Sequence, residues 1–211
     1  MRHPLSRLGA IRVFALAHRV PVFVLTLVGI GLAARVLARV RLPAADADFG
    51  SYTHAVAFFI MPALLGAPLA LSLDGDAAEL ERQAARSLAL GRVLLLLVLV
   101  AVSVGALAPA AMSHPVPDAC LVMVQGVLAV AGWTLCASRW LPPQLSWIVP
   151  LTATMIGILS PPGSSIGLIT LVVRQYEPRL LVASALWLIM WAIVFATGFT
   201  GRLQRSEDRV P

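Results

Sequence analysis

The side chains that can do chemistry in this chain gather in one polar segment, residues 73–92, which reads LDGDAAELERQAARSLALGR. Glu79 follows Asp76 by three residues, the spacing at which two side chains cap the start of a helix together. Acidic residues precede basic ones, as the helix dipole favours, so we expect a helix over 76–88. Its chemistry is noncovalent: the charges dock a protein partner or are simply solvated. The candidate docking residues are Asp76, Glu79, Glu81, Arg82 and Arg86.

Few other polar side chains are placed for chemistry. Gln125, Thr152 and Thr154 fall inside apolar runs, where they line a translocation path or, as is commoner, hydrogen-bond a neighbouring helix. The four histidines and two cysteines show no catalytic or metal-ligand spacing. We therefore predict no catalytic residue, no metal site and no enzyme activity on this chain.

Composition indicates a membrane protein. The chain has 211 residues, of which 59% are hydrophobic and 12% are charged, about half the charged share of soluble domains. We expect a single transmembrane domain over 1–211. All sixteen basic residues are arginine, and a chain without lysine lacks the phosphate-binding lysine of a P-loop ATPase. The arginines are scattered along loop ends, which indicates membrane topology and no nucleic-acid partner.

Six apolar runs approach the length of about 20 residues that a helix needs to cross a bilayer. The expected fold is all-α, with six transmembrane helices after an amphipathic interfacial helix at 1–19. Two pairs of small residues, Gly66 with Ala70 and Ala101 with Gly105, are spaced for close helix packing within one copy. The predicted spans are 20–38, 54–73, 91–112, 119–138, 145–160 and 180–199, and the fifth is short and contains Pro150.

The arginines also predict the orientation of the spans. With both termini in the cytoplasm, eleven arginines lie inside and five lie outside, as the positive-inside rule favours. This orientation puts the helix at 76–88 in the cytoplasm. It puts the loops at 42–53, 113–118 and 161–178 on the outer side.

This arrangement resembles the membrane subunit of type-2 ABC exporters. The resemblance lies in the architecture and in the polar loop, with ELER at 79–82 and LGR at 90–92. It implies that residues 76–88 are a coupling helix between spans two and three, in the cytoplasmic (inner) membrane of a bacterium. It further implies a separate cytosolic subunit that binds ATP and Mg, and a second membrane subunit, either an identical copy or a similar chain.

Other functions stay open on the sequence alone. The substrate-binding membrane subunit of a vitamin-type importer has about as many spans, but it needs a polar pocket near the outer face. A membrane structural or assembly protein fits the composition too. A membrane enzyme is disfavoured, because carboxylate, histidine and cysteine constellations are missing from the sequence.

Overall fold

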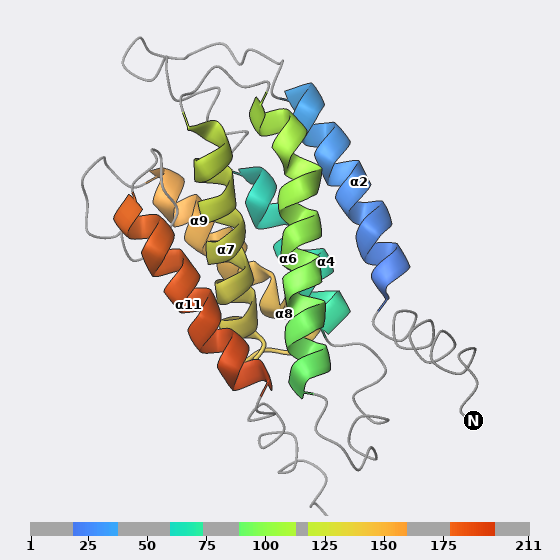
Figure 1. Cartoon of the computed structure of the whole chain (residues 1–211), viewed down its shortest axis with the longest axis vertical. Helices are drawn as coiled ribbons and strands as arrows, with labels where there is room; N and C mark the ends of the chain where they lie inside the picture. Colours follow the sequence, from blue (N-terminus) through green and yellow to red (C-terminus); the bar gives the residue numbers. More distant parts are fainter. Residues whose placement is uncertain (1–18, 38–59, 74–88, 113–117, 160–177, 197–211) are drawn as a thin grey trace, which may run out of the picture.

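The computed structural model describes residues 19–37, 60–73, 89–112, 118–159 and 178–196, and every regular element in these ranges is an α-helix (Figure 1). The all-α prediction is thereby confirmed for this part of the chain. The elements are α2 (Val20–Leu37), α4 (Gly66–Leu73), α6 (Ala89–Met112), α7 (Ala119–Ala137), α8 (Pro143–Ser146), α9 (Ile148–Leu159) and α11 (Pro178–Ala196). Residues 60–64 form a helical turn just before α4.

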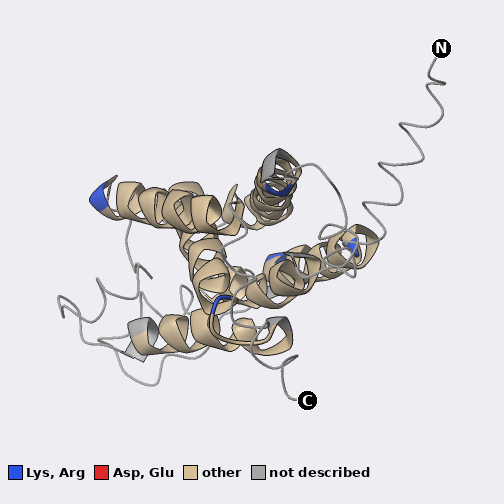
Figure 2. Cartoon of the chain, turned by 90° about the horizontal axis from the view of Figure 1, so that it is seen from below, with Lys and Arg blue, Asp and Glu red and all other residues tan. Residues whose placement is uncertain are grey.

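Three of these helices are long and apolar enough to cross a membrane, namely Gly91–Met112, Ala119–Ala137 and Pro178–Ala196. The other apolar helices, Val20–Val36, Ile60–Ser72 and Gln144–Ile156, are shorter. Large apolar side chains stay exposed on the outside of the bundle, for example Leu25 at 75% and Leu186 at 60%. Charged residues sit at helix ends, as the view from below shows (Figure 2). A surface of this kind is typical of helices that face lipid.

Helix α7 is the centre of the bundle. Buried residues occur on every side of it, and α4, α6, α9 and α11 all pack against it. Helix α2 lies outside, against α6 and α4 (Figure 1). Gly31 permits that contact, because a Cβ there would come within 2.8 Å of the carbonyl oxygen of Ala106.

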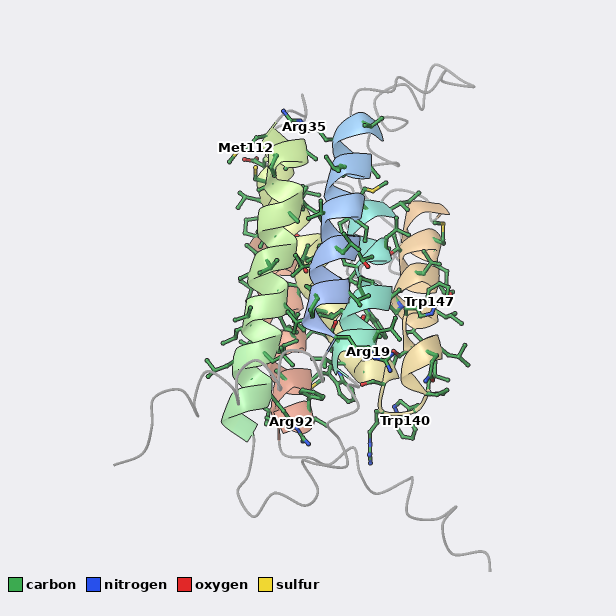
Figure 3. The ribbon with its side chains drawn as sticks, turned by 90° about the vertical axis from the view of Figure 1, so that its right-hand side faces the viewer. Arg19, Arg35, Arg92, Met112, Trp140 and Trp147 are labelled. Atoms are coloured by element: carbon green, nitrogen blue, oxygen red, sulfur yellow. The ribbon has the colours of Figure 1, made fainter. Side chains whose placement is uncertain are left out.

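Successive helices run in opposite directions through the bundle. Arg19, Arg92 and Trp140 lie toward one end and Arg35 and Met112 toward the other (Figure 3). We call these the Arg92 end and the Met112 end. Helices α2 and α6 therefore run from the Arg92 end to the Met112 end, whereas α7 runs back toward Trp140.

The second and fifth apolar runs are broken helices, each interrupted three residues before a proline. The helix at 60–73 breaks at Leu65, before Pro68, and the helix at 143–159 breaks at Trp147, before Pro150. Proline has no N–H to donate, and its ring clashes with the carbonyl four residues earlier. Where the structure describes the predicted second span, it is helical from Ile60 to Leu73 apart from the one irregular residue Leu65.

Several boundaries also differ from the predictions. Helix α6 begins at Ala89, two residues before the predicted start of the third span at Gly91. Helix α11 begins at Pro178, two residues before the predicted start, because proline suits the first position of a helix. The predicted interfacial helix at 1–19, apart from Arg19, lies outside the described residues, as do the coupling helix at 76–88 and residues 54–59 of the second span.

The two pairs of small residues behave differently. Gly66 lies against neighbouring helices, as expected, and Ala70 is buried one turn further along α4. Ala101 and Gly105 are exposed, and a Cβ on Gly105 would meet no atom within 4 Å. The expectation that this second pair packs within one copy is therefore wrong.

Candidate functional site

The predicted docking residues Asp76, Glu79, Glu81, Arg82 and Arg86 lie outside the described residues. Their flanks are described, however. Helix α4 ends at Leu73 and packs against α8, which begins three residues beyond Trp140. Helix α6 begins at Ala89, three residues before Arg92. The segment 74–88 therefore joins two helices whose adjoining ends lie toward the Arg92 end (Figure 3).

The two broken helices meet at their interruptions, on the surface of α7. A Cβ on Gly66 would lie 3.1 Å from Cγ of Pro150, 3.4 Å from Oγ1 of Thr134 and 3.7 Å from Cα of Trp147. A side chain larger than hydrogen would push these elements apart. We call this contact the break junction: Gly66 of α4, Trp147 and Pro150 at the start of α9, and Thr134 of α7.

The hydroxyl groups around the break junction are satisfied within their own helices. Thr134 Oγ1 donates to the carbonyl of Val130, and Thr154 Oγ1 donates to the carbonyl of Pro150, both at 2.8 Å. Bonds of this kind leave no donor of these hydroxyls for another helix or a ligand. The predicted path residue Thr154 is thus buried and already bonded, whereas Thr152 lies on the exposed side of α9.

A second buried interface, between α7 and α11, is the most extensive contact between two helices in the described residues. Trp187 lies over Gly132, where a Cβ would come within 2.3 Å of Cδ1 of the indole. Its ring also contacts Trp133, with centroids 5.1 Å apart, and Trp191, with centroids 5.8 Å apart. Only glycine at position 132 lets the indole approach the backbone of α7 so closely.

Polar atoms without hydrogen-bond partners gather at this α7–α11 interface. Both amide atoms of Gln125 and the hydroxyl of Ser184 are buried and unpaired, and so are the indole nitrogens of the three tryptophans. In the part of the chain that the structure describes, Gln125 and Ser184 are the buried side chains, apart from the three indoles, that lack a hydrogen-bond partner.

Sequence reasoning singled out Gln125 but missed Ser184 and the tryptophan cluster. Trp187, Leu188 and Trp191 follow Ser184 by three, four and seven residues, which places the four side chains on one face of α11. That spacing marks a common face, but it does not indicate which helix the face meets.

The ends of the bundle carry arginines beside aromatic rings. The Arg92 guanidinium lies 5.8 Å from the centroid of Phe195, and that of Arg139 lies 6.0 Å from the centroid of Trp140. These are cation–π distances, typical of side chains at a membrane surface. Among the described residues there is no cluster of histidine, cysteine, aspartate or glutamate that could hold a metal ion.

No protein-family model, curated protein or solved structure matches this chain.

Proposed function

We propose that this chain is the membrane-spanning subunit of an ATP-driven exporter, with six spans and both termini on the cytoplasmic side of a bacterial inner membrane. A separate cytosolic subunit binds ATP and Mg, and a second membrane subunit, identical or similar, supplies the other half of the path. The chain itself moves and performs no covalent chemistry.

The observation that supports this proposal is the break junction at the centre of an apolar bundle. Interrupted helices are tolerated at membrane depth where other helices or a cavity surround them. In transporters such interruptions commonly mark the moving or binding part of the fold. Here both interrupted helices pack on α7, and one of them, α4, leads directly into the charged segment at 74–88.

This connection suggests how force from a cytosolic partner reaches the membrane. A push on residues 76–88 acts on the end of α4 at Leu73 and on the start of α6 at Ala89. Helix α4 contacts α9 across Gly66 and Pro150, so its displacement shifts the break junction. We infer that α4 and α9 tilt together against α7 during a transport cycle, with Thr152 and Thr154 of α9 as the polar residues beside the moving helices.

A second candidate function is the substrate-binding membrane subunit of a vitamin-type importer. The observation that favours it is the buried, unpaired pair of Gln125 and Ser184, since such subunits hold a small ligand by a few polar groups. A ligand retained through purification would favour this function, whereas a co-purified ATPase that responds to residues 76–88 would favour export.

The predicted coupling helix at 76–88 provides the direct test. Changing both Glu79→Arg and Glu81→Arg should abolish or strongly weaken co-purification of the ATPase, because attraction turns into repulsion in a charge-paired contact. The matched control reverses two acidic residues of the predicted outer loop, Asp46→Arg and Asp48→Arg, and should leave the complex intact. Equal recovery of the ATPase with both double variants would show that residues 76–88 do not dock it.

The orientation is tested independently of any partner. A cysteine introduced by Ser87→Cys should be protected from an impermeant thiol reagent in intact cells, because the arginine bias puts this segment inside. A cysteine at Ser51, in the predicted outer loop, should react. Reaction at position 87 and protection at position 51 would reverse the proposed topology.

A further inference from the structure

Ser184 departs from the behaviour of the other buried hydroxyl groups. Ser72, Ser103, Thr134 and Thr154 each donate to the carbonyl four residues earlier, at 2.7 to 2.8 Å. The same bond is open to any serine inside a helix, and Ser184 has the carbonyl of Leu180 at that position. Yet its hydroxyl is buried without a hydrogen bond.

Gln125 shares this condition on the facing helix. Its side chain is 1% exposed, and neither the amide oxygen nor the amide nitrogen has a partner. Gln125 precedes Gly132 by seven residues, so both lie on the face of α7 that meets α11. Ser184 precedes Leu188 by four residues, and the backbone nitrogen of Leu188 would lie 3.3 Å from a Cβ on Gly132.

The two polar groups are close along the bundle. Helices α7 and α11 run in the same direction, since Trp140 follows α7 and Phe195 of α11 lies beside Arg92 at the same end (Figure 3). Measured from the contact of Gly132 with Leu188, Gln125 is about 10 Å and Ser184 about 6 Å toward the Met112 end, at 1.5 Å per residue. One oxygen atom at hydrogen-bond distance from both groups can bridge an offset of this size.

The chemistry of the pair selects the ligand. An amide and a hydroxyl each donate and accept, so together they satisfy a hydroxyl group, which also does both. Neither helix carries a charged residue between 119 and 137 or between 180 and 196, so the pair offers no counter-ion for a charged group. The tryptophan cluster lies further along the same interface and presents aromatic surface to an apolar body.

We propose that Gln125 and Ser184 form a binding site between α7 and α11 for the hydroxyl group of an uncharged, otherwise apolar molecule. The unsatisfied amide and hydroxyl destabilise the bundle while they lack a partner, and the bound hydroxyl relieves that penalty. This site belongs to α7 and α11 alone and goes beyond the proposed coupling to an ATPase.

Photolabelling of the purified full chain tests the site. The probe is an eight-carbon alcohol that carries a diazirine, and the comparison probe is the eight-carbon hydrocarbon with the same diazirine. Adducts of the alcohol should concentrate on α7 and α11 peptides and decrease with excess 1-octanol. The hydroxyl makes one hydrogen bond to each of the two side chains, and each bond is worth about 1 kcal/mol. The hydrocarbon makes neither bond, so it should label these peptides about 25-fold less.

Two variants test whether the labelling depends on the side chains of Gln125 and Ser184. Gln125→Leu and Ser184→Ala should each reduce alcohol adducts on α7 and α11 about fivefold, because each removes one hydrogen bond. The control Ser103→Ala removes a buried hydroxyl that is bonded within its own helix, and should leave labelling unchanged.

Undiminished labelling of both site variants, or equal labelling of α7 and α11 by the two probes, would overturn the proposed site. The thermal midpoint gives a second readout on the same samples: 1-octanol should raise the midpoint of the natural chain more than that of Gln125→Leu. An equal shift would contradict the proposal. No ATPase takes part in either measurement, so these outcomes are independent of the proposed export function.

Discussion

The break junction and the α7–α11 interface are both buried against the same central helix. They differ in whether their buried polar groups have hydrogen-bond partners. At the break junction, Thr134 bonds to a carbonyl of its own helix, and so does Thr154 one turn further along α9. At the α7–α11 interface, Gln125 and Ser184 have no partner. The difference indicates that the first region is complete within the chain, whereas the second is completed by a molecule from outside.

The two regions also differ in the continuity of their helices. Prolines interrupt the helices at the break junction, so the elements that meet there are short and their backbone ladders are incomplete. Helices α7 and α11 are continuous over 19 residues each and interlock through Trp187 on Gly132. We therefore expect motion at the break junction and rigidity along α7 and α11.

The largest effect is expected from overpacking the break junction. Gly66→Leu places a branched side chain where even a Cβ lies 3.1 Å from Pro150, so the broken helices must separate, at a cost of about 3 kcal/mol. Thermal unfolding followed by tryptophan fluorescence measures the loss. Gly29→Leu is the matched control, because Gly29 is exposed and a Cβ there meets no atom within 4 Å. Equal midpoints for the two variants would show that the junction is loosely packed.

A smaller loss is expected at the α7–α11 interface. Gly132→Ala brings a methyl group within 2.3 Å of the Trp187 indole, so the ring must turn away from α7, at a cost of about 2 kcal/mol. Tryptophan fluorescence should also shift, because the ring moves relative to Trp133 and Trp191. The control Gly105→Ala, at an exposed position with open space, should change neither quantity. An unaltered spectrum for Gly132→Ala would contradict the interlocked packing.

Replacing the unpaired amide of Gln125 should stabilise the chain, in contrast to the two substitutions above. Gln125→Leu removes two unsatisfied polar atoms and keeps an apolar side chain of similar size, so the free energy of unfolding should rise by about 1 kcal/mol in the absence of ligand. For a chain of this length that corresponds to about 3 °C in the midpoint. A lower midpoint would mean that the amide is paired in the folded chain.

The smallest effect is expected at a satisfied hydroxyl. Thr154→Val replaces a hydroxyl that bonds to the carbonyl of Pro150, and the free energy of unfolding should fall by less than about 1 kcal/mol. The contrast in sign with Gln125→Leu distinguishes the two regions. A rise in midpoint for both variants would remove the distinction between them.

Much of the fold follows from the sequence, because the bilayer leaves helices as nearly the only option for long apolar runs. The ranges of α2, α6, α7 and α11 lie within about three residues of the predicted runs. The interruption at Leu65 was not predicted, because Pro68 stands in a run of residues that otherwise favour an apolar helix. The short fifth run, with its Pro150, was a clearer signal of an interruption.

The candidate site follows from the sequence only in part. Gln125 stands out because a polar residue inside an apolar run is costly. Its relation to Ser184 depends on which helices pack together and at what register, and the contact of Trp187 with Gly132 sets that register. Local periodicity carries no information about such a contact between segments more than 50 residues apart. The charged residues of 76–88 remain a prediction from sequence alone.

The proposed function is tested most directly by the composition of the complex that this chain forms in native membranes. Mild cross-linking followed by native mass measurement should find two membrane subunits together with two ATP-binding subunits, and the Glu79→Arg, Glu81→Arg variant should lose the latter. A single copy of this chain, without a nucleotide-hydrolysing partner, that still moves substrate in liposomes would contradict the proposal of an ATP-driven exporter.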